Sequence, residues 1–150
     1  MQQSPKKTSQ NGVALIKRFE GLRLNKYQDC TGKWTIGYGH LIKCNETFNN
    51  ILTQEEALVL LLNDIQETEK EVLRVLTPDV NQNQFDALIS FTFNLGIKNL
   101  ENSTLLMLVN QGQYQLAGKQ FLRWNLAGGH ICDGLTKRRK AESALFLRPL

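Results

Sequence analysis

Hydrophobic side chains recur at steps of three and four residues over most of the chain, which is the pattern of amphipathic helices packed on a core. The longest such stretch opens with Thr53 and Glu56, which are spaced as a capping box, and it ends before Pro78. This pattern predicts a helix of about six turns over residues 53–76, long enough to join two lobes of a small protein.

Shorter helical patterns lie on both sides of this long helix. The first is expected from about Gly12 to Glu20, with Asn11 as its N-terminal cap and Gly21 at its C-terminal end. The later ones are expected over residues 81–96, 103–110, 114–126 and 136–147. The first of these later helices is the most apolar, so it is expected at the centre of the larger lobe.

Between the first helix and the long one, the pattern changes to that of strands. Residues 33–38 alternate with a period of two and follow a turn that contains glycine, so residues 22–40 predict a small antiparallel hairpin. In this alternation Trp34 and Ile36 share one face, and Thr35 points to the other. The whole pattern predicts an α+β protein, in which the long helix joins a small sheet lobe to a helical lobe.

The length and composition fit one folded domain. A chain of 150 residues buries about 70% of its surface on folding, so it needs neither a disulfide nor a metal to hold it together. Hydrophobic residues make up 41% and charged residues 21%, which excludes disorder over the whole chain. We expect a single domain over 1–150, made of a flexible N-terminus (1–10), an N-terminal lobe (11–52), the connecting helix (53–76) and a helical lobe (77–150).

The charge narrows the choice of partners and the N-terminus suggests a compartment. A net charge of +4 and a pI of about 9.1 suit an anionic partner, which can be nucleic acid, a membrane surface or a bacterial wall. Residues 1–8 lack the apolar stretch of a signal peptide, and the most apolar run, 57–62, is too short to span a bilayer. These features predict a protein that is made and kept in a cytoplasm until it is released.

The cysteines Cys30, Cys44 and Cys132 are odd in number, and their spacing matches no metal-ligand pattern. We interpret them as free thiols, with a bridge between Cys30 and Cys44 as the alternative. The chain is therefore expected to fold without a disulfide.

Three polar side chains stand where the first helix passes into the hairpin. Glu20 ends the helix, Asp29 closes the first expected strand and Thr35 lies on the next, with eight and then five residues between them. A chain that leaves a helix and folds into a hairpin can bring all three around one cleft. Glycosidic cleavage uses such a set, because an acid protonates the leaving oxygen while a second carboxylate, about 6.5–9.5 Å away, leaves room for a water.

This spacing resembles the catalytic signature of the phage-type lysozymes, the endolysins of glycoside hydrolase family 24. Segments that look like those of the same family lie at residues 20–23, 35–40, 87–88, 93–96, 121–124 and 134–139, followed by Glu142. These segments occur in order from about residue 11 to residue 147, and their combination is far more specific than any one of them.

The resemblance implies a two-lobed lysozyme-like fold and hydrolysis of the β-1,4 bond between N-acetylmuramic acid and N-acetylglucosamine in peptidoglycan. It implies an inverting path without metal or cofactor. Glu20 would be the general acid, Asp29 the base or a charge stabiliser, and Thr35 the residue that holds the water. The family's substrate contacts carry over to Leu41, Phe93 and Ser103, whereas a further polar contact would align near Gly118, which has no side chain.

Roles are also expected for the basic run 137–140 and for His40. In the basic run 137–140, either Arg138 or Arg139 is expected to turn towards Glu20 in the cleft. Arg138 is counted among the substrate-binding residues. The other charges of the run are expected to face an anionic wall. His40 is expected to anchor the sheet through a hydrogen bond and not to act as a base.

Three other functions fit the sequence less well. A lytic transglycosylase keeps the acidic glutamate but typically lacks the aspartate and threonine partners, and this chain has both. A wall-binding module would show repeats or an appended module, and a DNA-binding protein would carry its basic residues on a recognition helix. The sequence therefore favours a monomeric peptidoglycan hydrolase that binds no nucleic acid.

Overall fold

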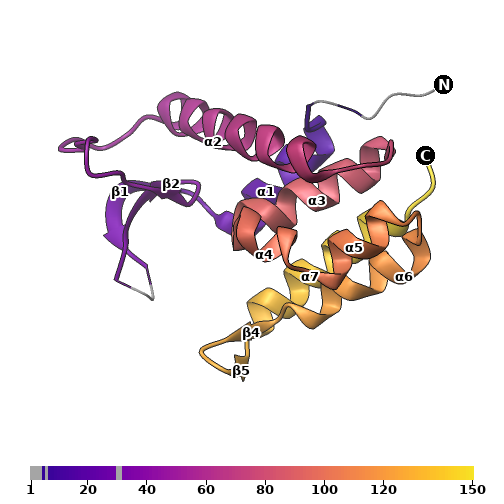
Figure 1. The fold of residues 1–150 in the computed structure, drawn as a ribbon. Coiled ribbons are helices and arrows are strands. Elements are labelled where there is room, and N and C mark those ends of the chain that lie inside the picture. Colours follow the sequence, from indigo (N-terminus) through magenta and orange to yellow (C-terminus); the bar gives the residue numbers. More distant parts are fainter. Residues whose placement is uncertain (1–4, 6, 30–31) are drawn as a thin grey trace.

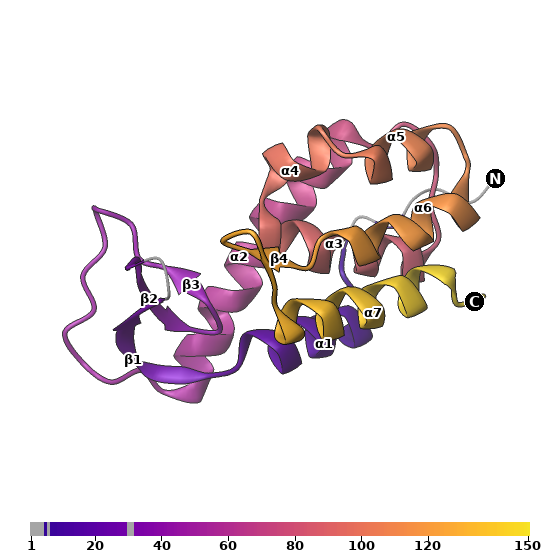
Figure 2. The same cartoon turned by 90° about the horizontal axis from the view of Figure 1, so that it is seen from below.

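The computed structural model describes residues 5, 7–29 and 32–150, so Cys30 and any bridge that it forms lie outside the described residues. A small sheet stands at one end of the molecule, and α2 (Gln54–Val75) runs from it to a larger group of helices (Figures 1 and 2). The α+β architecture and the long connecting helix expected from the sequence are confirmed. No helix in this part of the chain combines the length and the apolar character needed to cross a membrane.

The sheet is antiparallel and joins β1 (Arg23–Gln28), β2 (Trp34–Gly37) and β3 (His40–Leu41) in that order. Thr35 pairs with Tyr27 on one side and with Leu41 on the other, so these three side chains share one face. Ile36 lies on the opposite face, where it is buried with Leu52 and Ala57 beneath α2. The predicted separation of Thr35 from Ile36 is therefore confirmed, whereas the third strand was not predicted.

The remaining helices are α1 (Gln10–Glu20), α3 (Gln82–Leu95), α4 (Ile97–Glu101), α5 (Thr104–Asn110), α6 (Tyr114–Gln120), the short 3-10 helix η1 (Phe121–Arg123) and α7 (Asp133–Leu147). Capping boxes open α2 at Thr53 and α3 at Asn81, as the sequence predicts. Residues 85–92 of α3 are all buried, and α1, α2 and α7 all contact α3, which confirms its central place.

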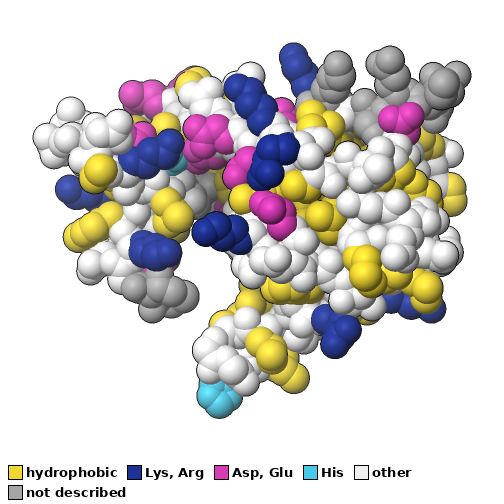
Figure 3. All heavy atoms as spheres, viewed as in Figure 1, with side chains coloured by type: hydrophobic (Ala, Val, Ile, Leu, Met, Phe, Trp, Pro, Cys, Tyr) yellow, Lys and Arg dark blue, Asp and Glu magenta, His cyan; other side chains and the backbone are white. Residues whose placement is uncertain are grey.

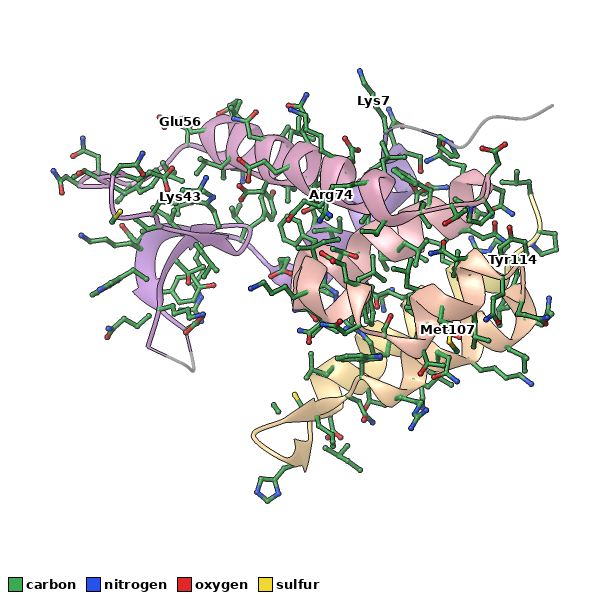
Figure 4. All side chains as sticks on the ribbon, viewed as in Figure 1. Lys7, Lys43, Glu56, Arg74, Met107 and Tyr114 are labelled. Atoms are coloured by element: carbon green, nitrogen blue, oxygen red, sulfur yellow. The ribbon has the colours of Figure 1, made fainter. Side chains whose placement is uncertain are left out.

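Salt bridges on the surface link some of these helices. Arg74, near the end of α2, reaches Glu101 at the end of α4, with 3.1 Å between Nη2 and Oε1 (Figure 4). Both side chains are well exposed, so this pair adds little to the stability of the fold.

The start of α1 differs from the prediction. Ser9, not Asn11, caps the helix, because its side chain accepts a hydrogen bond from the Gly12 N–H. The segment is tied to the helical lobe, since the Ser9 N–H donates to Asp86 Oδ1 (3.0 Å) and the Thr8 hydroxyl donates to Glu69 Oε2 (2.7 Å). Ordered structure therefore begins within the segment that was expected to be flexible, because tertiary partners on α2 and α3 bind it.

The segment between α6 and α7 also differs from the prediction. The helix expected over 114–126 ends at Gln120, and the one expected from residue 136 begins at Asp133. A hairpin of β4 (Leu126–Ala127) and β5 (His130–Ile131) lies between them, and both glycines of its turn have positive φ. These glycines were interpreted as a simple break between helices, but they allow the chain to reverse direction.

Candidate active site

Glu20 is the last residue of α1, and Gly21, with φ 71°, turns the chain from the helix into β1. The side chain of Glu20 is 17% exposed, and Arg138 Nη1 on α7 donates to its Oε2 at 2.6 Å. A carboxylate at a helix C-terminus is disfavoured by the helix dipole, so the charge of Arg138 compensates for an unfavourable position. The two residues are 118 positions apart, so only the tertiary fold brings them together.

Gly39, in the turn between β2 and β3, closes the other side of Glu20. Its φ is +73°, a conformation that favours glycine. A Cβ atom at this position would overlap Glu20 Oε1 and lie 3.1 Å from Glu20 Cδ. The Glu20 carboxylate is therefore held between a guanidinium group and a backbone turn that has no room for a side chain.

Asp29 follows β1 directly and Thr35 lies in β2, so both belong to the β1–β2 hairpin. The Lys33 N–H donates to Asp29 Oδ1 at 2.9 Å, so the carboxylate also shapes the hairpin turn. Thr35 is 3% exposed, and its hydroxyl donates to the carbonyl oxygen of Lys33 at 3.1 Å. With its hydrogen committed to that carbonyl, the hydroxyl oxygen can accept a hydrogen bond from a water.

The charges of Glu20 and Asp29 both affect the pKa of Tyr27. Burial raises the pKa of the Tyr27 phenol above its usual value, Arg23 opposes this rise, and the charges of Glu20 and Asp29 add to it. Arg23 lies over the Tyr27 ring, 4.3 Å from its centre. Tyr27 thus pairs with Thr35 in the sheet and is affected by the charges of both Glu20 and Asp29, although the sequence did not single it out. Counting residues outward from the hairpin turn would have paired Tyr27 with Thr35.

Two of the expected substrate contacts face one hollow between the lobes. Leu41, which is half-exposed, and Phe93 line a hollow of about 280 Å³ together with Gly39. Because Gly39 also abuts Glu20, this hollow lies next to the proposed acid. Figure 3 shows the surface hollowed between the sheet lobe and the helical lobe.

The third expected contact, Ser103, lies in a different hollow of about 470 Å³, which Arg123 and Trp124 also line. The Ser103 hydroxyl donates to the Leu100 carbonyl (2.6 Å) and accepts from the Leu106 N–H (3.0 Å), so it caps α5. The hydroxyl hydrogen and one lone pair of Ser103 are therefore already used within the fold.

The position of Gly118 does not form a subsite. Gly118 is buried in α6, where a Cβ atom would overlap the side chain of Leu147 on α7. A polar side chain at this position would therefore meet the core and not the cleft.

The sequence left open which arginine of the basic run on α7 faces Glu20, and the structure answers this. Arg138 is the arginine that pairs with Glu20, whereas Arg139 is fully buried, with its guanidinium 5.3 Å from the centre of the Phe91 ring. Lys137 and Lys140 are exposed. Sequence spacing could not decide between the arginines. It fixes the angle of about 100° between neighbouring helical residues, but not how the helix is rotated relative to Glu20.

His40 anchors the sheet lobe, as expected. Its Nδ1 lies 2.7 Å from Asp64 Oδ2 on α2, and its Nε2 lies 2.9 Å from Glu46 Oε1 in the following loop. The hydrogen bond with Asp64 raises the pKa of the imidazole, burial opposes it, and Glu46 raises it further. The ring is therefore held by two carboxylates in a structural position.

This shift makes a pH-dependent stability difference measurable. A folded-state pKa above the unfolded value means that the contribution of His40 is complete below about pH 6.5 and is lost as the pH rises through the folded-state pKa. We expect His40→Gln to lower the free energy of unfolding by about 1–3 kcal/mol near pH 6 and by less near pH 9. Urea unfolding at both values measures this, and His130→Gln, at an exposed histidine, is the control. A loss that is equal at both pH values would contradict the assignment.

No three His, Cys, Asp or Glu side chains in the described residues are grouped so that they could hold a metal ion.

Comparison with known sequences places the chain among phage proteins. Residues 17–142 match the family model described as phage lysozyme. The chain is 44% identical over 145 residues to an endolysin of Bacillus phage B103, covering 93% of this chain and 53% of the relative, so it spans about half of that protein. It is 41% identical over 142 residues to an endolysin of Salmonella phage P22, covering 93% of this chain and 97% of the relative.

Solved structures give the same result. The muramidase domain of SpmX from Asticaccaulis excentricus has a TM-score of 0.86 to this chain at 38% sequence identity, covering 95% of this chain and 99% of that one. The family model matches most of the chain. The chain belongs to the phage lysozyme family.

Proposed function

We propose that this protein is an endolysin that hydrolyses the β-1,4 bond between N-acetylmuramic acid and N-acetylglucosamine in bacterial peptidoglycan. The observation that carries the proposal is the position of Glu20, which is partly exposed and held between Arg138 and Gly39 beside the hairpin of Asp29 and Thr35. The similarity to endolysins and to a muramidase domain supports the choice of substrate.

In this mechanism Glu20 gives its proton to the glycosidic oxygen, and the bond between that oxygen and the sugar C1 breaks. A water attacks C1 from the opposite face. One of its hydrogens is directed to Thr35 Oγ1, whose own hydrogen is already donated to Lys33, and the other is directed to Asp29. Asp29 takes the proton that the water loses, so the configuration at C1 inverts.

The substrate would extend from this point into the hollows on both sides. Leu41 and Phe93 supply apolar surface for a sugar ring next to Glu20, and the half-exposed Leu41 is free to contact it. Ser103 shapes the wall of the second hollow by capping α5, and Arg123 there offers a positive charge to a carboxylate of the peptidoglycan. Arg138 contributes by holding Glu20.

The same proposal includes a single domain, a monomeric state and storage in the host cytoplasm. The protein is one lysozyme domain over 1–150, with its catalytic lobe at 11–52. Glu20, Asp29 and Thr35 all lie within that lobe, so a monomer suffices for the reaction. The exposed Lys137 and Lys140 on α7 form a basic face towards the anionic wall. Cys44 and Cys132 are free thiols, which fits storage in the reducing host cytoplasm before release to the wall.

A lytic transglycosylase acting on the same bond is the main alternative, and product analysis separates the two. We expect purified sacculi treated with the enzyme to release muropeptides with reducing N-acetylmuramic acid ends, because a held water completes the reaction. Mass spectrometry distinguishes these from anhydro ends. Anhydro products would mean that the sugar closes on itself, and no release at all would contradict both activities.

A further inference from the structure

Glu142 on α7 is a fully buried carboxylate that the proposed mechanism does not use. Both of its oxygens lie against arginines, since Oε1 is 2.9 Å from Arg139 Nε and Oε2 is 3.3 Å from Arg138 Nε. The Ser90 hydroxyl on α3 donates to Oε2 at 2.5 Å. Arg138, Arg139 and Glu142, here called the arginine–glutamate cluster, therefore place three charges in the core of the helical lobe.

Arg138 connects this cluster to the proposed acid. Its Nη1 donates to Glu20 Oε2 (2.6 Å), its Nε donates to Glu142 (3.3 Å), and its Nη2 donates to the Ser90 carbonyl oxygen (3.1 Å). All three nitrogens are occupied and the side chain is 4% exposed, so the guanidinium is fixed between the two carboxylates. A single guanidinium group therefore lies between the carboxylates of Glu142 and Glu20.

Arg139 balances the second side of Glu142. Its Nη2 donates to Asn94 Oδ1 at 2.6 Å, while its Nη1 makes no hydrogen bond with the described residues. Burial lowers the pKa of Arg139 to about 10 and raises that of Glu142, so each charge depends on its neighbours for compensation. With Glu20 and Arg138, the four formal charges sum to zero.

Few other charges face this group. On α3 the one charged residue is Asp86, which binds Ser9 and Gln82 instead. On α1, Lys17 lies over Tyr38 and Arg18 over Phe19. The titratable side chains of the β1–β2 hairpin near Glu20 are Arg23, Tyr27 and Asp29. Lys119 in α6 and Arg123 in η1 are exposed to solvent. The cluster is thus the main set of buried charges behind Glu20.

We propose that Glu142 and Arg139 are positioning residues that set, through Arg138, how firmly Glu20 holds its proton. The negative charge of Glu142 offsets part of the effect that Arg138 has on Glu20. The positive charge of Arg139 in turn offsets part of the effect of Glu142. This inference rests on the proposed role of Glu20 as the acid. Stability alone does not account for the cluster, because replacing a buried ion cluster by apolar residues is often neutral or stabilising.

The test is the pH dependence of wall lysis in three variants. A general acid must be protonated, so activity falls on the alkaline side as Glu20 loses its proton. Glu142→Gln leaves the full charge of Arg138 on Glu20, so we expect the alkaline limb to move down by about one pH unit. Arg139→Gln removes a positive charge and is expected to move the limb up. The double variant Arg139→Gln/Glu142→Gln is expected to bring it back near wild type.

The opposite signs separate this role from a structural one, which would lower activity without moving the limb in two directions. Lys119→Gln removes an exposed charge from α6, which packs on α7, and should leave the limb in place. If Glu142→Gln does not fold, Arg139→Gln and the double variant differ only at Glu142, and the limb must lie lower in the double variant. Limbs that do not move, or that move in the same direction, overturn the inference. If Glu20→Gln lyses walls as fast as wild type, the proposed role of the acid fails instead.

Discussion

Glu20→Gln is expected to lower wall-lytic activity by at least about 10²–10⁴-fold, because glutamine keeps the shape of the side chain and removes the proton donor. The thermal midpoint is expected to stay the same or to rise. Arg138 keeps its bonds to Glu142 and Ser90 in the variant, so no buried charge is left without a partner. Turbidity clearing of permeabilised cells and thermal unfolding measure the two effects.

The matched control for this variant is Glu55→Gln, at an exposed glutamate in the first turn of α2. It makes the same chemical change far from the proposed cleft and is expected to leave lysis unchanged. Clearing by Glu20→Gln at more than about a tenth of the wild-type rate would remove Glu20 from the role of acid.

Gly39→Ala is expected to reduce lysis by about 100-fold, because the new methyl group would displace Glu20 from its place between Arg138 and the turn. The variant also pays the backbone cost of alanine at a positive φ, which is about 1 kcal/mol. Initial rates of lysis, compared with free energies of unfolding from urea titration, separate the two losses.

Gly112→Ala provides the control, since Gly112 has a similar φ of +75° and nothing lies within 4 Å of the position of its Cβ. The two variants should lose similar stability, but only Gly39→Ala should lose activity. Equal activity in both variants would show that Glu20 does not need the space at Gly39.

Local signals predicted the elements that local interactions determine. The capping boxes at Thr53 and Asn81 open helices as expected, because the side chains that satisfy the first N–H groups are only three residues away. The alternation around Thr35 predicted its face of the sheet for the same reason. The cap of α1 was wrong because the segment is fixed by Asp86 and Glu69, which are distant in sequence.

The sequence named candidate members of the site, but it did not give the contacts that these residues make. The spacing of Glu20, Asp29 and Thr35 pointed to one cleft, and the hairpin register places Thr35 beside Tyr27. The choice of Arg138 over Arg139 depends on how α7 packs against α1, and spacing within one helix does not contain that information. The hairpin of β4 and β5 was missed because its strands are only two residues long and show no period.

The central claim is that Glu20 works as an acid opposite a water held by Thr35 and Asp29, and the stereochemistry of the first product tests it most directly. A water that attacks from the face opposite the leaving group inverts the configuration at C1. Proton NMR of a defined glycan oligomer, recorded before mutarotation mixes the anomers, is predicted to show the α anomer first. If the β anomer forms first, the water is not where Thr35 and Asp29 would hold it, and the account of the site is contradicted.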